Sequence, residues 1–198
     1  MRIEYIVNMI DKCNTLLDVG CDHGRMSKLA LDKKICGRVI ATDISQSCLD
    51  KAKTLLKNYD NAEFVLRDGI PEEVAADFIL ICGMGGHTIS GILSKYNGNA
   101  KMLLSPQSHG EQVRHALIEK GYGITYDRCF ESGGKYYDLI KAERMGEIAE
   151  ADELHLKYGM FFESKNASLK NRLLRMLSKL KPENEKYAEI SEVLNWQK

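Results

Sequence analysis

The residues with the clearest chemical character lie in LLDVGCDHGRM (16–26), an apolar run followed by a loop of glycines and charged side chains. A loop that holds a pyrophosphate needs the spacing G-x-G-x-x-G, and a P-loop needs a following Gly-Lys-Ser/Thr. Here Gly20 and Gly24 are four residues apart, no such Gly-Lys follows, and Asp18 and Asp22 would repel a phosphate. The loop instead suits a ligand with a cationic end, such as the ammonium and sulfonium groups of S-adenosylmethionine.

Acidic and small residues also follow the next three apolar runs of the chain. Asp43 comes roughly 20 residues after the glycine loop, the position from which a carboxylate accepts hydrogen bonds from a ribose. Asp68 is placed to hold an adenine amino group, and the glycines of CGMGG (82–86) leave room for the methionine part of the ligand. The candidate cofactor-binding residues are Asp18, Gly20, Cys21, Asp22, His23, Gly24, Asp43, Ile44, Asp68, Gly69, Gly83, Met84 and Gly85.

Several of these residues also have a purely structural interpretation. Asp43 alone could be a turn or capping residue. His23 and His109 could cap helices or bond to the backbone, and Met84 could fill the core. The cofactor hypothesis therefore rests on the four strand ends taken together.

The elements that must position these residues alternate between short apolar runs and amphipathic stretches. The alternation indicates βαβ units and a parallel sheet, in which ligands bind at the carboxyl ends of the strands. After Gly121 two strand-like runs, ITYDRCFE and KYYDLIKAE, flank the turn SGG and predict an antiparallel hairpin that finishes the sheet. The expected strands are 15–19, 38–42, 62–66, 77–82 and 101–105, and the expected helices are an N-terminal one around Ile3 to Ile10, 25–33, 45–58 with Ser45 as its N-cap, 87–95 and 110–120.

The tail from Glu153 has a different periodicity. Phe162, Leu169 and Met176 recur every seven residues, which predicts one long helix with an apolar seam. KPEN (181–184) interrupts this pattern, and its proline can open a second helix. We therefore expect two units, an α/β domain over 1–150 and a C-terminal α-helical coiled-coil hairpin over 151–198.

Positive charge is concentrated in this tail, although the whole chain has 28 basic and 28 acidic residues. Between Lys157 and Lys181 seven basic side chains stand against the single acid Glu163. Such a run can be a solvated helix face, but on a neutral protein it favours contact with a phosphate backbone. The candidate RNA-binding residues are Lys170, Arg172, Arg175 and Lys179, together with Arg114 on the helix expected at 110–120, for which a solvated charge is the alternative.

The chain resembles the bacterial tRNA (adenine(22)-N(1))-methyltransferases, also called TrmK. The resemblance is carried by DVGCDHG, GMGG, a Pro-Gln segment followed by HGEQVR, GGKYYDLI and the helical tail. It implies a class I methyltransferase (Rossmann-like) fold with a C-terminal coiled coil, S-adenosylmethionine as cofactor, and N1 of an adenine in tRNA as the target. Where the family usually has Gln-Pro-Asn, this chain has Ser105, Pro106 and Gln107.

A ring-nitrogen target agrees with the residues at the strand ends. Methyltransferases acting on an exocyclic adenine amine commonly carry Asn/Asp-Pro-Pro-aromatic after the fourth strand, where this chain has CGMGG. Adenine N1 has a free lone pair at neutral pH, so positioning in line with the leaving sulfur is enough and no general base is needed. The base must first leave its helix. Ser105 or Gln107 could then hydrogen-bond the adenine edge, which makes them the catalytic candidates.

The remaining composition excludes several classes of protein. The six cysteines contain no CxxC pair, so we expect reduced thiols, no disulfide framework and no metal site. No signal peptide or membrane-spanning segment is recognisable, so we expect a cytoplasmic protein. Two alternatives stay open: a methyltransferase for a small molecule or a protein, and an inactive module that binds S-adenosylmethionine or RNA.

Overall fold

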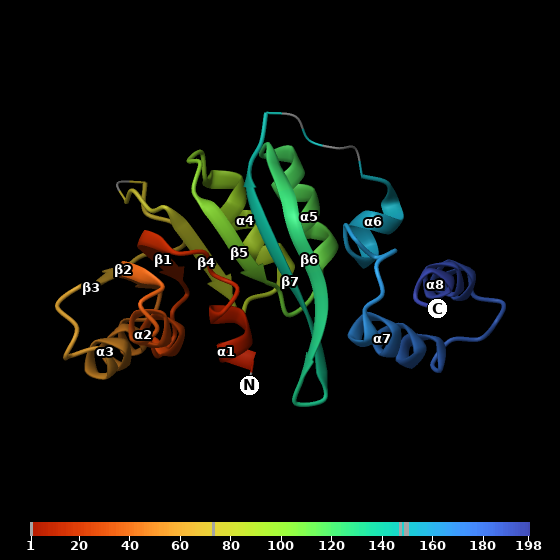
Figure 1. The fold of residues 1–198 in the computed structure, drawn as a ribbon, viewed down its shortest axis with the longest axis horizontal. Helices are drawn as coiled ribbons and strands as arrows, with labels where there is room; N and C mark the ends of the chain where they lie inside the picture. The colour runs from red at the N-terminus through yellow and green to blue at the C-terminus, as the bar shows by residue number, and fades with distance from the viewer. Residues whose placement is uncertain (1, 73, 147, 149–150) are drawn as a thin grey trace.

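The computed structural model describes residues 2–72, 74–146, 148 and 151–198. Its centre is a seven-stranded sheet with the strand order β3-β2-β1-β4-β5-β7-β6 (Figure 1). The first five strands are parallel, and β7 runs antiparallel to both β5 and β6. The strands are β1 (Cys13–Val19), β2 (Cys36–Asp43), β3 (Ala62–Leu66), β4 (Phe78–Cys82), β5 (Lys101–Ser105), β6 (Tyr122–Ser132) and β7 (Lys135–Arg144).

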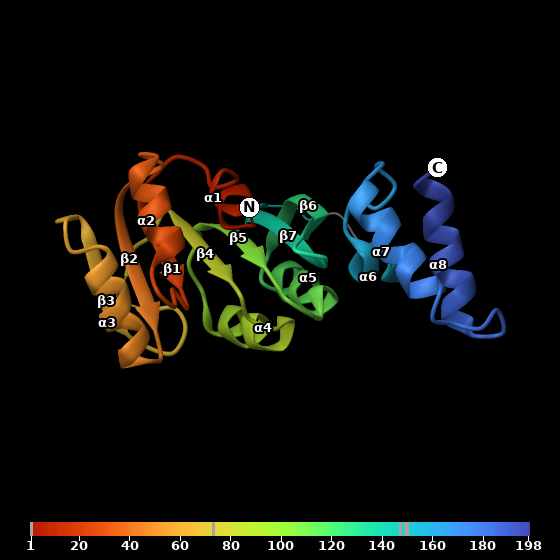
Figure 2. The ribbon, with the colours of Figure 1, turned by 90° about the horizontal axis from the view of Figure 1, so that it is seen from below.

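Helices cover both faces of the sheet, which explains why its central strands read as unbroken apolar runs. Neighbouring residues of a strand point to opposite faces, so Leu16 packs in one core and Leu17 in the other. The first core contains residues of α1 (Arg2–Val7), α2 (Arg25–Asp32) and α3 (Gln46–Leu55), and the second contains residues of α4 (Gly86–Lys95) and α5 (Gly110–Glu119). Figure 2 shows α1 and α2 on one side of the central strands and α4 and α5 on the other.

The predicted order of strands and helices in the sheet domain is confirmed. The strands expected at 62–66 and 101–105 have those bounds, and the others differ by one or two residues at one or both ends. Ser45 caps α3, because its Oγ accepts a hydrogen bond from Cys48 N at 3.4 Å. Gly133 and Gly134 both have positive φ angles, 61° and 72°, as a tight turn between twisted antiparallel strands requires.

The single long helix expected from Glu153 is wrong. The tail forms α6 (Glu153–Tyr158), α7 (Ala167–Leu177) and α8 (Glu185–Trp196), and the segment between α6 and α7 is not helical. Gly159 follows α6 with a φ of 122°, and Asn166 begins α7 by accepting a hydrogen bond from Leu169 N at 3.0 Å. A seven-residue apolar spacing identifies residues that share a core, but it does not require the backbone between them to stay helical.

The two last helices do form the expected hairpin. The seam residues Phe162, Leu169 and Leu173 are buried with Ile190 and Val193 of α8 in a third core. The second helix begins at Glu185, after the cap Asn184, and not at the proline. The predicted domain boundary at residue 150 lies outside the described residues.

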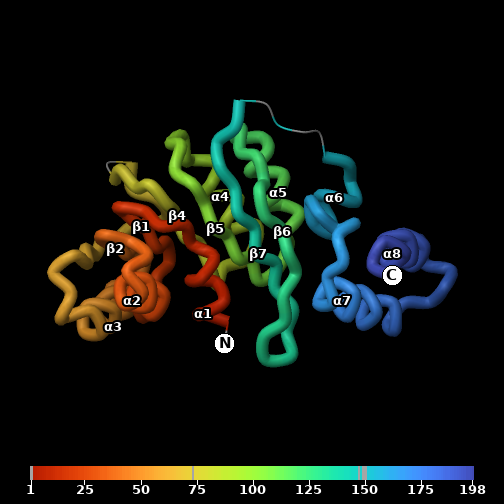
Figure 3. The backbone as a smooth tube through the Cα atoms, in the orientation of Figure 1, coloured from red at the N-terminus to blue at the C-terminus, as the bar shows by residue number. Residues whose placement is uncertain are grey.

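The tail packs against the antiparallel edge of the sheet. α6 contacts α5, and α7 contacts both strands of the β6–β7 hairpin. Figure 3 traces this return of the chain past β6, at the opposite end of the molecule from α3. Among the residues that the structure describes, no helix is long and apolar enough to cross a membrane.

Candidate functional site

A cavity of about 530 Å³ opens at the carboxyl ends of the central strands. β1 and β4 are neighbours in the sheet, while the chain passes through β2 and β3 between them, so the strand order reverses at this point. Such a switch point is where open α/β sheets bind their ligands. The cavity is lined by most of the residues predicted to bind a cofactor, namely Asp18, Gly20, Cys21, Asp22, His23, Asp43, Ile44, Asp68, Gly69, Gly83 and Met84.

The loops after β1 and β2 are held together by Asp43. Its Oδ2 accepts a hydrogen bond from Asp22 N at 3.0 Å, and its Oδ1 accepts one from Ser45 N at 2.9 Å. Each carboxylate oxygen has a second lone pair, so the side chain can still accept hydrogen bonds from a ligand. The turn role and the binding role of Asp43 are therefore compatible. Ile44, directly after it, exposes 73% of its surface beside the cavity.

Asp18 supplies a negative charge at the base of the cavity. It is only 3% exposed, and Ser27 Oγ on α2 donates a hydrogen bond to its Oδ2 at 2.5 Å. Burial raises the pKa of Asp18 to about 6, although the hydrogen bonds from Ser27 oppose that shift. The carboxylate is mostly ionised at neutral pH, and a cationic group that entered the cavity would stabilise it.

The glycines let the loops approach one another closely. Gly20 has a φ of 71°, and a Cβ at this position would overlap Met84 Cε. Gln107 N donates to Met84 O at 2.9 Å, and Gly86 N donates to Ser108 O at 2.8 Å. These bonds join the loops after β4 and β5 into one unit that carries the Gln107 side chain along the cavity.

Residues 1–140 match a family model described as a methyltransferase domain. The chain belongs to this methyltransferase family. A Bacillus subtilis relative named tRNA (adenine(22)-N(1))-methyltransferase is 28% identical over 168 residues, which are 80% of this chain and 71% of that protein.

Solved structures share the whole fold, including the helical tail. The structure of M. capricolum TrmK in complex with S-adenosyl-homocysteine has a TM-score of 0.78 and 22% identity, and the match covers 100% of this chain and 95% of that one. The B. subtilis m1A22 tRNA methyltransferase TrmK has a TM-score of 0.80 and 21% identity, covering 99% and 94%. The expected class I methyltransferase fold with a helical tail is thereby confirmed.

Two residues of the predicted cofactor set lie outside the lining of the methyltransferase cavity. Gly24 precedes α2 with a φ of 71°, and a Cβ there would come 3.0 Å from Ala52 Cβ, so this glycine allows α2 and α3 to pack closely. Gly85 is the N-cap of α4. Gly24 is thus needed for the shape of its loop, whereas Gly85 has an ordinary φ of −72°. Contact of these two glycines with the cofactor stays a prediction.

Two predicted contact residues are corrected by their burial. Ser105 is 3% exposed, and its Oγ donates to Asp138 O at 3.0 Å, so its hydroxyl does not face the cavity. Arg114 is 1% exposed and cannot reach RNA, because its Nε and Nη2 donate to Asp127 at 2.6 and 2.9 Å. The buried Val113 and Leu117 stand one and three residues away on the same helix, a spacing that signals an inward position for Arg114.

The basic residues of the tail divide into two groups. Arg172 Nη1 donates to Asp138 Oδ1 at 2.7 Å, so this charge is paired within the protein, although 36% of its side chain is exposed. Arg175 and Lys179 are exposed, and Lys170 is half-buried. Of the predicted set, these three make no ion pair with a described residue and can contact a partner.

Several lining residues of the cavity were missed by the sequence argument. Thr88 lies in the first turn of the helix that GMGG opens, so its place could have been inferred from that motif. Arg2 and Ile3 reach the cavity from α1, which no local pattern reveals. The other missed residues are Val19, Arg25, Met26, Arg67, Cys82 and Ile92. In the described part of the chain, no group of three or more His, Cys, Asp or Glu side chains is arranged to hold a metal ion.

Proposed function

We propose that this methyltransferase transfers a methyl group from S-adenosylmethionine to N1 of adenine 22 in tRNA. The observation that carries the proposal is the cavity at the strand-order switch point, with the buried carboxylate of Asp18 at its base and the Gln107 amide along it. The B. subtilis relative is a tRNA (adenine(22)-N(1))-methyltransferase, which supports the choice of tRNA and of adenine N1.

The residues present fit S-adenosylmethionine, which supplies the electrophilic methyl group on a sulfonium. Asp18 provides the negative charge that its cationic end requires, and Asp43 provides free lone pairs for the ribose hydroxyls. Asp68 and Ile44 lie at the ends of β3 and β2, where they would hold the adenine by a hydrogen bond and by apolar contact. The lack of a phosphate-binding glycine pattern agrees with a ligand that has no phosphate.

The chain acts on the acceptor by positioning it. Adenine N1 needs no proton removed, so the site requires a group that orients the base and no general base. Gln107 is that group, because its amide can both donate to and accept from the pairing edge of adenine. Ser105 contributes indirectly, since its hydrogen bond to Asp138 O anchors the end of β5 from which Gln107 projects.

The accessible basic residues of the tail, Lys170, Arg175 and Lys179, would contact the phosphate backbone of the tRNA. This assigns catalysis to a unit covering 1–150 and part of the RNA binding to a unit covering 151–198. We place the protein in the cytoplasm, where tRNA is modified.

The test is to incubate the protein with radiolabelled S-adenosylmethionine and two tRNA transcripts that differ only by A22→G. Label should enter the A22 transcript, and nuclease digestion with mass spectrometry at neutral pH should give 1-methyladenosine. Label in the A22→G transcript would refute the position, and N6-methyladenosine would refute the ring-nitrogen target. Absence of label from both, with label in a protein or small-molecule fraction of an extract, would support the alternative class of methyltransferase.

A further inference from the structure

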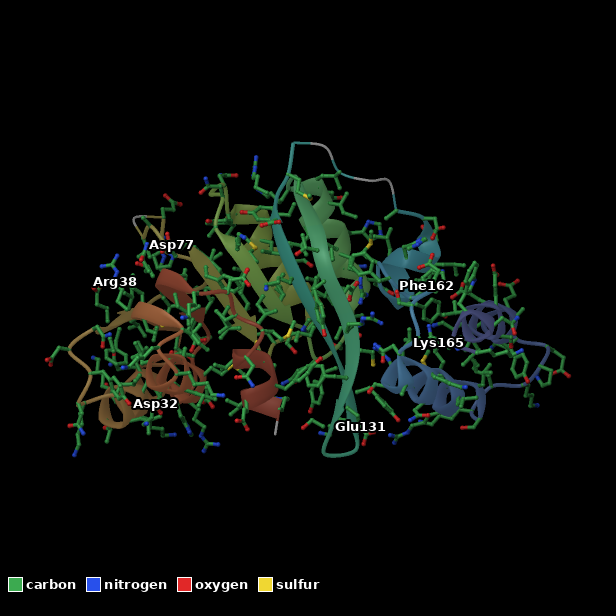
Figure 4. The ribbon with its side chains drawn as sticks, viewed as in Figure 1. Asp32, Arg38, Asp77, Glu131, Phe162 and Lys165 are labelled. Atoms are coloured by element: carbon green, nitrogen blue, oxygen red, sulfur yellow. The ribbon has the colours of Figure 1, made fainter. Side chains whose placement is uncertain are left out.

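A second cavity of about 560 Å³ opens between α1, β6 and the segment that leads into α7. Three basic side chains line it, Arg2, Arg128 and Lys165, and we call this cavity the basic cleft. Among the described residues that line it, Glu131 is the only acidic one. In Figure 4, Lys165 is labelled on the segment before α7 and Glu131 near the tip of the β6–β7 hairpin.

The positive charge of the basic cleft is not neutralised by the described residues around it. Arg128 Nη1 donates to the carbonyl oxygens of Ser164 at 3.5 Å and Lys165 at 3.3 Å, and these acceptors carry no formal charge. Among the described residues, none of the ion pairs within 4.0 Å involves Arg2, Arg128 or Lys165. Unpaired cations around one cavity create a positive potential that favours the binding of an anionic ligand.

Aromatic side chains form one wall of the cleft. The Tyr5 and Phe130 ring centroids are 4.8 Å apart, and the Tyr5 and Tyr126 hydroxyl oxygens are 3.0 Å apart. Tyr5 is 38% exposed, so part of its ring is open to a ligand. Cations beside an accessible aromatic ring are the combination with which proteins hold single-stranded RNA, through phosphate contacts and base stacking.

The position of the cleft relates it to the cofactor cavity. Arg2 lines both, and its guanidinium lies 5.0 Å from the Tyr137 ring centroid on the hairpin. An RNA strand whose target base enters the cofactor cavity would therefore have its adjoining phosphates near Arg2. The same strand could continue past Arg128 and Lys165 toward the exposed Arg175 on α7.

We propose that the basic cleft binds the phosphate backbone of the RNA strand next to the target nucleotide. The inference rests on the proposed function, since it takes tRNA as the substrate. It goes further by assigning the strand to a surface formed jointly by α1, the hairpin and the entry to α7. The tail then contributes to binding by completing this cleft as well as by its own exposed charges.

The test compares two variants of equal charge. Arg128→Gln with Lys165→Gln removes two cleft cations, and Lys53→Gln with Lys57→Gln removes two from α3 and its end, at the opposite edge of the sheet. Binding of unmodified tRNA is measured by fluorescence anisotropy over a range of salt concentrations. Each lost phosphate contact lowers the slope of log affinity against log salt concentration by about 0.7 to 0.9, so two lost contacts should lower it by about 1.4 to 1.8. At about 0.1 M salt this corresponds to about 25- to 60-fold weaker binding of tRNA by the cleft variant.

Further measurements separate binding from folding and from the proposed function. Arg128→Lys with Lys165→Arg keeps both charges and should bind tRNA nearly as the wild type does. The cleft variant should retain its affinity for S-adenosylmethionine by calorimetry and lose activity through KM more than kcat. If wild-type protein methylates tRNA and the cleft variant binds it like the α3 control, the cleft assignment is wrong and the function stands. If wild-type protein neither binds nor methylates tRNA, the function itself fails.

Discussion

Replacement of Asp127 by asparagine should lower the free energy of unfolding by about 3 kcal/mol, because it removes one partner of a buried ion pair. The Asp127 carboxylate accepts hydrogen bonds from Arg114 Nε at 2.6 Å, from Arg114 Nη2 at 2.9 Å and from Met160 N at 2.8 Å. Both charged side chains are about 1% exposed. The pair joins α5 and β6 to the segment after α6, so its loss should also loosen the docking of the tail.

The magnitude follows from what remains around Arg114. Breaking a buried pair costs about 3 to 5 kcal/mol when the remaining charge is left without compensation. Here Asp138 Oδ2 still lies 3.6 Å from Arg114 Nη2, and Arg114 Nη1 still donates to Leu156 O at 3.0 Å. Asparagine also keeps an oxygen for Met160 N. These three interactions place the expected loss at the lower end of the range.

The assay is urea unfolding followed by circular dichroism, with an exposed pair as the control. Glu63→Gln breaks an ion pair between Glu63 and Arg38, in which the side chains are 57% and 47% exposed, respectively. This change should lower the free energy of unfolding by less than about 1 kcal/mol. Arg114→Met combined with Asp127→Leu removes both charges but also leaves Met160 N and Leu156 O without these partners, so it should recover only part of the loss. The reasoning is refuted if Asp127→Asn costs no more than Glu63→Gln.

Three further predictions concern ligand binding. Asp43→Ala should weaken S-adenosylmethionine binding by about 1.5 to 3 kcal/mol, as for a hydrogen bond to a charged group, and calorimetry on the folded variant showing unchanged affinity would remove Asp43 from the site. The pKa of Asp18 is about 6, and its ionised form attracts the cationic ligand. The affinity of the wild-type protein for S-adenosylmethionine should therefore fall as the pH drops from 7 through 6. Asp18→Asn should bind the cofactor weakly, with little dependence on pH over that range. A variant with glutamine at Lys170, Arg175 and Lys179 should show a smaller slope of log tRNA affinity against log salt concentration, by about 0.7 to 0.9 for each phosphate that it no longer binds. Its affinity for the cofactor should be unchanged. A wild-type slope would show that these charges are only a solvated face.

Local patterns in the sequence were sufficient to predict the order of the sheet elements and the cofactor loops. Strand and helix patterns depend on neighbouring residues, so apolar alternation located β1 to β5 and the β6–β7 hairpin. The strand ends could be combined into one site because parallel strands bring their carboxyl ends to the same edge of the sheet. For this reason Asp18, Asp43, Asp68 and Met84, which are far apart along the chain, were expected together and line one cavity.

Which polar residues face inward, and which parts of the chain meet, depended on the tertiary fold. Arg114 and Ser105 have the residue types of contact residues, but their partners Asp127 and Asp138 lie on strands that follow them in the sequence. The segment between α6 and α7 is likewise held by the hairpin, because Met160 N donates to Asp127 and Asn166 Nδ2 donates to Cys129 O. Arg2 reaches the cofactor cavity and the basic cleft because α1 packs against both α2 and the β6–β7 hairpin. Residue spacing reports the local backbone period, whereas burial and ion pairing depend on which distant segments the folded sheet brings into contact.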